Sequence, residues 1–413
     1  MIEEKEQKKV WEFPWGYRES FMVALELLLL GLIFQIIPGK RQFTGLQWPI
    51  NLAIGLALII LLITLHVFFK KEPIVKWLSS IPAAVSSITL FAFVVLLLGF
   101  IPQQNTEVPG IIRMFGLNSL RNSWLLFLSG LYLLTCLVLV ILRRMLPVNT
   151  RNLGFLLNHA GLCIILLAGA LSTGDLKRVS IQLNEGDKFL NSGINQSGDV
   201  VKLPFEIKLL DFAIDEYPPE IGIGNPETGE IIDESGSTLF RIKEKQEYKI
   251  KEWIIKVNEI ITDAYPLEER FISIDSVGAA PAAFVSVRNT RTDRTIEGWI
   301  SCGSYAFSPA FLNLDDQNVL FMEHPKPAKY SSLLASIQDG RTDTFSIEVN
   351  NPVHIKGYSL YQLSYDEHLG KWSQVSIIEA VRDPWLPVIY IGIIMVLAGS
   401  VYLFWKGNEI RKE

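Results

Sequence analysis

Six long apolar runs set the organisation of this chain. A helix needs roughly 20 mostly apolar residues to cross a bilayer, so each run predicts a membrane-spanning helix. Five of these runs come early in the chain, and the sixth lies near the C-terminus. The predicted spans are residues 20–38, 49–69, 82–102, 123–146, 153–172 and 386–405.

The block between the last two spans, residues 175–384, has a different pattern. Residues 344–381 alternate in side-chain character at period two, with turn chemistry at Asn350, Asn351 and Pro352. The sequence AAFVSVRNTRTDRTIEGWI at 282–300 resembles two strands around a polar turn. Helical periodicity is scarce, so we predict antiparallel sheets in a sandwich or split barrel. The expected fold class is therefore an integral membrane protein with six transmembrane helices and one large β-rich domain inserted between helices five and six.

Composition agrees with a chain that lies partly in a bilayer and partly in water. Hydrophobic residues make up 49% of the chain, yet 20% of its residues are charged. The net charge of -5 gives no sign of nucleic-acid binding, which would need a concentrated basic face, so we expect no nucleic acid partner. The three cysteines form no CxxC or CxxCH motif, which excludes a thioredoxin-like dithiol and a covalent haem site of the chain's own. They are Cys136, Cys163 and Cys302.

Lysine and arginine fall unevenly on the segments that flank the spans. Connections on the cytoplasmic side are enriched in these residues. We therefore predict that both termini are cytoplasmic and that the β-rich block is extracytoplasmic. The first run lacks an A-x-A cleavage site, and we expect it to be a retained anchor. One alternating set of flanks holds thirteen cations and the other holds four; the thirteen are Lys5, Lys8, Lys9, Arg18, Lys70, Lys71, Lys76, Arg143, Arg144, Arg151, Lys406, Arg411 and Lys412, and the four are Lys40, Arg41, Arg113 and Arg121.

Ionisable residues inside a span are costly and indicate function by default. His159 in the fifth span lies roughly 12 Å beyond Arg151, whereas His66 in the second span lies only about 6 Å from Lys70. Neutral imidazole is a common haem-iron ligand, and the small residues around Gly161 would let a macrocycle or another helix approach. The alternative for His159 is a hydrogen bond to a neighbouring helix, with Asn158 marking a polar contact.

Other candidate residues favour ordinary roles. His66 and Glu26 lie toward the cytoplasmic leaflet, where their side chains can reach for the headgroups, although a polar pocket shared with His159 stays open. No Ser/His/Asp constellation, Gly-rich phosphate loop or Walker pattern occurs, so hydrolase and ATPase functions lack a motif. Three histidines of the β-rich block have no metal-ligand spacing, and we expect them at the surface. They are His324, His354 and His368.

Five segments from about Pro82 onward share a distinctive arrangement. In the last of them, a strand pair through YQLSYDE and VRDP leads directly into a terminal span. Together these segments resemble the ResB (also CcsB) family. They are LLLGFIPQQ, SWLLFLSGLYLLTCLVLVILRR, LGFLLNHAGLCIILLAGAL, LPFEIKLLDFAIDEYP and GYSLYQLSYDEHLGKWSQVSIIEAVRDPWLPVIYIGIIMVLAGSVYLFW.

The resemblance implies one half of a System II cytochrome c synthase in the bacterial inner membrane. Such a machine carries haem b across the bilayer and attaches it to the thiols of apocytochrome c. The implied partners are a CcsA/ResC-type membrane protein, apocytochrome c and the lipid bilayer. The family's transmembrane histidine, an axial ligand of the haem iron, falls on His159. No catalytic residue is assigned to this chain.

Two departures from the family pattern divide the chain. The first two spans are additional to the usual four, so no family role passes to Glu26 or His66. A WGxxWxWD segment is absent, since WEFPWGY at 11–17 does not match it, and the haem-handling half is therefore expected to be a separate protein. The expected domains are 1–81 with the two extra spans, 82–174 with ResB-like spans three to five, the β-rich domain 175–384, and 385–413 with the terminal span.

Two other functions compete with this one. In the first, the chain is a scaffold that stabilises its partner without contacting haem, and His159 is then a packing residue. The second is a membrane b-type cytochrome, which usually needs paired histidines on two helices, and only His66 complements His159. The estimated depths of these two residues differ by about 6 Å, which argues against that pair.

Overall fold

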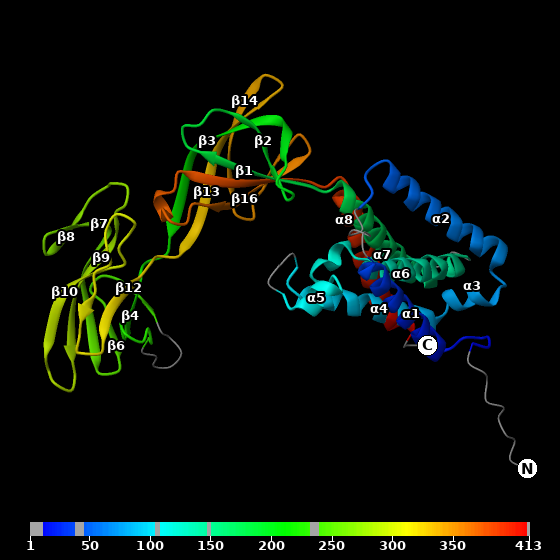
Figure 1. The fold of residues 1–413 in the computed structure, drawn as a ribbon, viewed down its shortest axis with the longest axis horizontal. Helices are drawn as coiled ribbons and strands as arrows, with labels where there is room; N and C mark the ends of the chain where they lie inside the picture. The colour runs from blue at the N-terminus through cyan, green and yellow to red at the C-terminus, as the bar shows by residue number, and fades with distance from the viewer. Residues whose placement is uncertain (1–10, 38–44, 104–107, 147–149, 232–238, 411–413) are drawn as a thin grey trace, which may run out of the picture. The chain divides into compact units, whose positions relative to one another are not determined.

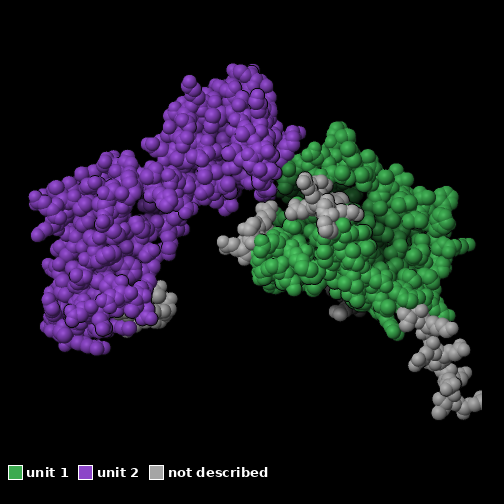
Figure 2. All heavy atoms as spheres, in the orientation of Figure 1, with its two compact units in different colours: residues 1–176, 383–413 green, residues 177–382 purple. Residues whose placement is uncertain are grey.

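A computed structural model describes residues 11–37, 45–103, 108–146, 150–231 and 239–410 of the chain (Figure 1). The chain forms two compact units, which Figure 2 colours separately. One unit comprises residues 1–176 with 383–413, and the other comprises residues 177–382. Several cations that were used to predict the orientation lie outside the described residues. They are Lys5, Lys8, Lys9, Lys40, Arg41, Arg411 and Lys412.

The first unit is helical. Within the described residues, six of its helices are long and apolar enough to cross a membrane, which confirms the six predicted apolar helices. Three short helices were not predicted: α3 (Pro73–Leu78), α5 (Gly110–Met114) and the 3-10 helix η1 (Leu117–Asn122). The six long helices are α1 (Tyr17–Ile36), α2 (Ile50–Phe69), α4 (Ile81–Phe100), α6 (Trp124–Arg144), α7 (Thr150–Asp175) and α8 (Leu386–Ile410).

Helix α6 is the centre of the helical unit. One of its faces packs with α1 and α4 around Tyr132 and Cys136. Its other face packs with α2 and α7 around Leu134 and Val138. Helix α8 packs along α7. Because both faces of α6 pack against other helices, a larger share of its residues is buried than in the other spans.

The second unit is built from β-strands in three sheets, and every strand pairing is antiparallel. This result confirms the predicted large β-rich domain, including the two strands expected at 282–300, which are β9 (Ala280–Asn289) and β10 (Thr295–Ser301). The first sheet has the order β14-β13-β3-β2-β1-β17-β16-β15. Its strands are β1 (Lys177–Asn184), β2 (Leu190–Asn195), β3 (Val200–Glu216), β13 (Pro327–Gln338), β14 (Arg341–Glu348), β15 (Val353–Ile355), β16 (Tyr358–Tyr365) and β17 (Val375–Arg382).

The other two sheets complete the unit. One has the order β10-β9-β7-β6, with β8 paired to β7, and the other has the order β11-β12-β4-β5. Their side chains share one core, in which Ile255, Val285 and Leu320 are fully buried. The remaining strands are β4 (Glu220–Gly224), β5 (Phe240–Arg241), β6 (Glu247–Ile250), β7 (Trp253–Leu267), β8 (Arg270–Ser273), β11 (Leu312–Asn313) and β12 (Val319–Glu323).

A separate core lies on the first sheet, around Ile181, Ile207 and Leu360. The β-rich unit therefore has two hydrophobic cores. The short 3-10 helix η2 (Gly370–Trp372) connects them, because Nε1 of Trp372 donates a 2.8 Å hydrogen bond to the carbonyl oxygen of Ala279. Strands β1 and β17 pair along their whole length, so the chain enters and leaves this unit on adjacent strands.

Candidate functional site

His159 lies on α7, whose opposite sides have different neighbours. On one side, Cys163 and Leu167 pack with α2 and α6. On the other side, small residues allow a close approach to α8: a Cβ atom added at Gly161 would lie 2.6 Å from the carbonyl oxygen of Gly392. Asn158 also faces α8, where its Oδ1 accepts a 3.1 Å hydrogen bond from Oγ of Ser400. The polar contact expected at Asn158 therefore involves α8, and the small residue Gly161 accommodates a helix.

Asp175 ties the end of α7 to two other helices. Its Oδ1 accepts a 2.7 Å hydrogen bond from the backbone N–H of Trp48. Its Oδ2 accepts 2.7 Å bonds from Nδ2 of Asn51 and from Nε1 of Trp385. Hydrogen bonds to a charged acceptor are stronger than neutral ones. This carboxylate thus holds the start of α2 and the start of α8 against the helix that carries His159.

The imidazole of His159 is held by the turn of α7 that precedes it. Its Nδ1 lies 2.9 Å from the carbonyl oxygen of Phe155, four residues earlier. The ring also stacks on that of Phe155, with 3.7 Å between centroids and an angle of 27°. The guanidinium of Arg144, at the end of α6, lies 4.5 Å from the centroid of the Phe155 ring. Arg144, Phe155 and His159 therefore form one connected group of side chains.

This hydrogen bond fixes the chemistry that His159 offers. A carbonyl oxygen only accepts, so Nδ1 carries the proton and donates it. In the neutral ring, Nε2 is then the nitrogen with a free lone pair. Histidines that bind metals have this arrangement, in which the second ring nitrogen donates to a backbone carbonyl or a carboxylate. His159 is half-buried, and the group is thus suited to bind iron through Nε2.

His66 lies on α2, close to the end of that helix, and is half-buried. Within the described residues, no hydrogen bond or ring contact joins it to His159. Asn51 of α2 bonds Leu171 and Asp175 of α7, and Gly55, one turn later, packs on Leu167 and Leu171, so these two helices run antiparallel at this contact. Counting from it, His66 lies about 17 Å along α2 and His159 lies about 12–18 Å along α7. The structure therefore reduces the difference in depth that the sequence predicted.

Glu26 lies elsewhere in the helical unit, near the middle of α1, with its side chain exposed. The structure does not bring it to His159, because α1 packs with α4 and α6 whereas His159 lies on α7. The shared polar pocket considered for Glu26, His66 and His159 is therefore not formed by the described residues of α1.

The histidines of the β-rich unit lie at its surface, as the sequence predicted: His324, His354 and His368 are all exposed. Nδ1 of His354 lies 2.9 Å from Oγ of Ser359. Among the residues that the structure describes, no group of three His, Cys, Asp or Glu side chains is arranged to hold a metal ion. In the described part of the β-rich unit, these histidines are thus surface residues and do not form a metal site.

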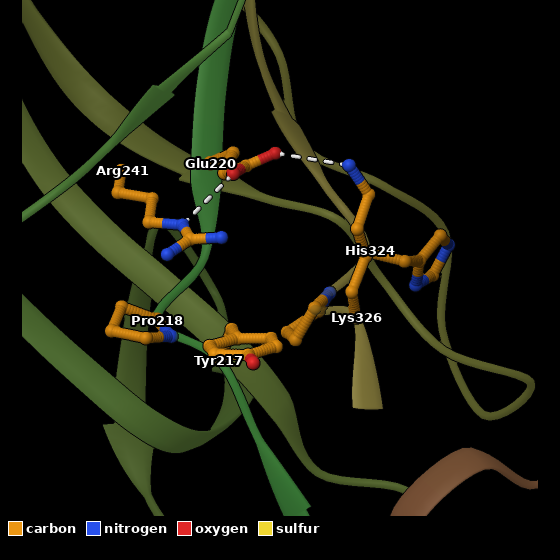
Figure 3. Close-up of a pocket in the computed structure, with 7 residues that line it drawn as sticks. Tyr217, Pro218, Glu220, Arg241, His324 and Lys326 are labelled. Carbon is orange, nitrogen blue, oxygen red and sulfur yellow. Dashed lines mark hydrogen bonds and ion pairs between the residues drawn. The ribbon is translucent and has the colours of Figure 1, made fainter. Parts of the chain in front are cut away.

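A small pocket lies where β3 leads to β4, beside His324 (Figure 3). Glu220 is held there by Arg241 at 3.1 Å and by Lys326 at 3.3 Å. Burial acts against ionisation of Glu220, but these two cations together lower the pKa of its carboxyl. The pocket has a volume of about 10 Å³, which is about the space of one water molecule. The three charged groups therefore act as a structural cluster.

Sequence reasoning missed two members of the site, Phe155 and Arg144, and the role of Asp175 at the far end of α7. The four-residue spacing of Phe155 and His159 could have indicated a pair on one helix face. Arg144 counted only as a flanking cation, and Asp175 counted only as the first residue of the β-rich domain. The partners of Asp175 come from distant parts of the sequence, and nothing local marks them.

Comparison with known families adds one match. A model described as the ResB-like family matches residues 149–259 and 282–379, which together make up just over half of the chain. His159 and Phe155 fall in the first matched range, and Arg144 lies five residues before it. A search of curated proteins found no match.

Proposed function

The chain belongs to the ResB-like family, and from this membership we propose that it is a subunit of a System II cytochrome c synthase. Membership implies involvement in cytochrome c biogenesis. The finer proposal is that the chain takes part in carrying haem b across the bacterial inner membrane and in attaching it to apocytochrome c. A CcsA/ResC-type membrane protein would supply the other half of the synthase.

The six apolar helices support insertion in a bilayer. Trp48 and Trp405, near the ends of two of these helices, are exposed by 66% and 76%, as tryptophans at a membrane–water interface are. The distribution of Lys and Arg supports cytoplasmic termini and an extracytoplasmic β-rich unit. On this topology, Asp175 lies at the outer end of α7, and His159 lies on the cytoplasmic half of that helix.

The hydrogen bond from His159 Nδ1 to the carbonyl oxygen of Phe155 is the observation that carries the proposal. It holds the ring with Nε2 free for an axial bond to haem iron, and the stacked Phe155 limits rotation of the ring. In this proposal, haem is the substrate that the synthase moves. The residues of this chain hold and orient one side of it, and the partner supplies the opposite ligand.

The thiols that become thioethers belong to apocytochrome c in this proposal. Cys302, which is in the β-rich unit, has only 3% of its surface exposed. Burial raises the pKa of its thiol to about 12, so the reactive thiolate is scarce at neutral pH. We propose that the β-rich unit helps to present apocytochrome c without a thiol of its own taking part.

The test is to co-express the chain with the CcsA/ResC-type protein of the same genome, purify the complex in detergent, and measure reduced-haem absorption per complex. We expect His159→Ala to lose most of the haem while the complex stays intact. The matched control is His66→Ala, which removes the other histidine of the spans and should leave haem per complex unchanged.

A scaffold that never contacts iron predicts a different result. In that case His159→Ala lowers the amount of complex recovered, while haem per complex stays constant. Full haem retention in an intact His159→Ala complex would reject the ligand role and move the search for iron ligands to the partner.

A further inference from the structure

Among the residues that the structure describes, helix α1 packs against the rest of the chain through one face. Ala24, Val23 and Leu27 pack into the core that α1 shares with α4 and α6. The opposite face is apolar and open: Leu25, Leu29 and Ile33 are exposed by 55%, 50% and 55%. A span that faces lipid exposes apolar side chains in this way. All exposed residues on such a face are expected to be apolar.

Glu26 interrupts that face. It lies nine residues after Tyr17 and ten before Ile36, so about 14 Å and 15 Å of helix separate it from the two ends of α1. These distances place it near the centre of a bilayer whose apolar core is about 30 Å thick. A glutamate side chain has two methylene groups and cannot reach the headgroups from this depth. The sequence-based expectation that Glu26 reaches the interface therefore does not fit α1.

The surroundings of Glu26 within the chain do not compensate its charge. One helical turn away on its own face lie Met22, Leu29 and Leu30, which offer no hydrogen bond to a carboxylate. Among the described residues, no hydrogen bond or ion pair engages its side chain. An ionisable residue at mid-bilayer costs a few kcal/mol even on lenient scales and is normally paired. Since the described residues supply no such group, a basic side chain of another molecule would compensate this charge.

We propose that the Glu26 face of α1 is an intramembrane docking surface for a spanning helix of a second protein, and that this helix carries a basic side chain at mid-bilayer depth. This inference rests on the proposed function, in which the chain spans the membrane beside a CcsA/ResC-type protein. It gives the first additional span a role: α1 is fixed to the bundle by one face and recognises the partner by the other.

A second copy of this chain is a poorer occupant of that surface. In the described spans, Lys and Arg lie only near the helix ends, as Arg18, Arg143 and Arg144 do. Two histidines, His66 and His159, are the basic residues of the described spans that lie deeper. The proposed function assigns Nε2 of His159 to haem, and His66 lies only three residues before the end of α2. A two-fold symmetric contact through the same face would bring two Glu26 carboxylates toward each other.

The experiment uses the full chain, tagged and co-expressed with the CcsA/ResC-type protein of the same genome, and measures how much of that protein is recovered per chain in detergent. Glu26→Gln keeps the size of the side chain and removes its charge. We expect it to lower recovery by about tenfold or more, which corresponds to roughly 1.4 kcal/mol. Glu26→Asp keeps the carboxylate and should retain most of the partner.

Ile60→Gln is the matched control. Ile60 lies near the middle of α2 and is 63% exposed, so this variant places the same amide at a similar depth on another open face. Its recovery should equal that of the wild type. The proposal is overturned if Glu26→Gln recovers the partner in full, or if Ile60→Gln loses as much of it.

A photo-crosslinking residue at Leu29, one turn from Glu26, identifies the occupant directly. A crosslink to a span of the co-expressed protein supports the proposal, and a crosslink to a second copy of this chain overturns it. Haem absorption of the same sample is a separate readout. Recovery that depends on Glu26 in a complex without haem would refute the proposed haem role and leave the docking surface standing.

Discussion

Nε1 of Trp385 donates a 2.7 Å hydrogen bond to Oδ2 of Asp175, although the two residues are 210 positions apart in the chain. The bond joins the end of α7 to the start of α8, and the strands that continue from these helices pair with each other from Lys177 and Arg382 onward. The chain thus leaves the helical unit and returns to it at two fixed, neighbouring points.

Trp385→Phe removes this donor and keeps most of the ring. A hydrogen bond to a charged group contributes about 1.5–3 kcal/mol, so we expect the free energy of unfolding of the detergent-purified chain to fall by about that amount. Thermal unfolding measures the change. Trp405→Phe, at a tryptophan that is 76% exposed, is the control and should leave the midpoint nearly unchanged. Equal midpoints for the two variants would show that the bond does not contribute.

The close packing of α7 against α8 at Gly161 and Gly392 gives a second prediction. A Cβ atom at Gly161 would lie 2.6 Å from the carbonyl oxygen of Gly392, whereas nothing lies within 4 Å of a Cβ atom at Gly169. Gly161→Ala should therefore destabilise the chain by about 1–3 kcal/mol through overpacking. Gly169→Ala adds the same methyl group to the same helix and should be neutral or slightly stabilising. Unfolding midpoints that fall equally in both variants would contradict this close packing.

Glu216 gives a pH-dependent prediction for the β-rich unit. Burial raises the pKa of its carboxyl above the ordinary value of 4.5; Lys371 lowers it in part, and Asp263 adds to the rise. The folded state therefore binds this proton more tightly than the unfolded state, so stability is lost as pH rises above 4.5. Glu216→Gln should raise the unfolding midpoint at pH 7, and this gain should vanish below pH 4.5.

The control for that measurement is Glu269→Gln, in an exposed turn between β7 and β8. Tryptophan fluorescence of the full chain can follow unfolding from pH 4 to pH 7 in both variants. If Glu216→Gln raises the unfolding midpoint at pH 4 as much as at pH 7, the ionised carboxylate of Glu216 is not what destabilises the wild type.

Cys302 should be inert in the folded chain. A pKa raised by burial from 9.0 to about 12 lowers the thiolate fraction at pH 8 by about three orders of magnitude. Maleimide labelling, followed by mass spectrometry, should detect no adduct at Cys302 until the chain is unfolded. Cys302→Ala should also keep covalent haem attachment to apocytochrome c intact. Rapid labelling of the native chain, or loss of attachment in the variant, would assign this thiol a chemical role.

The long helices could be predicted because hydropathy and length alone identify them. The span predicted at 153–172 lies inside α7, and the structure extends that helix to Thr150 and Asp175. Its extension could not be foreseen, because Asp175 is polar and its partners at Trp48 and Trp385 are distant in sequence. The short helix α3 is six residues long and therefore lacks a periodic signal.

The β-rich unit was predictable as a class and not as a topology. Alternation identified the strands around 282–300 and 344–381, but each strand gives no information about its non-local partners. The pairing of β1 with β17 and the separation of two cores follow from contacts across the whole unit. At the site, the sequence identified His159 as a ligand candidate inside a membrane span. The proton on Nδ1 became evident only from the position of the Phe155 carbonyl.

The central claim is that Nε2 of His159 binds haem iron. The most direct measurement is the absorption spectrum of reduced haem in the purified complex that carries His159→Ala, recorded with and without added imidazole. We predict that the variant loses most of its haem signal and that imidazole, which replaces the missing ring, restores it. A variant complex that retains its full haem spectrum without imidazole would contradict the claim.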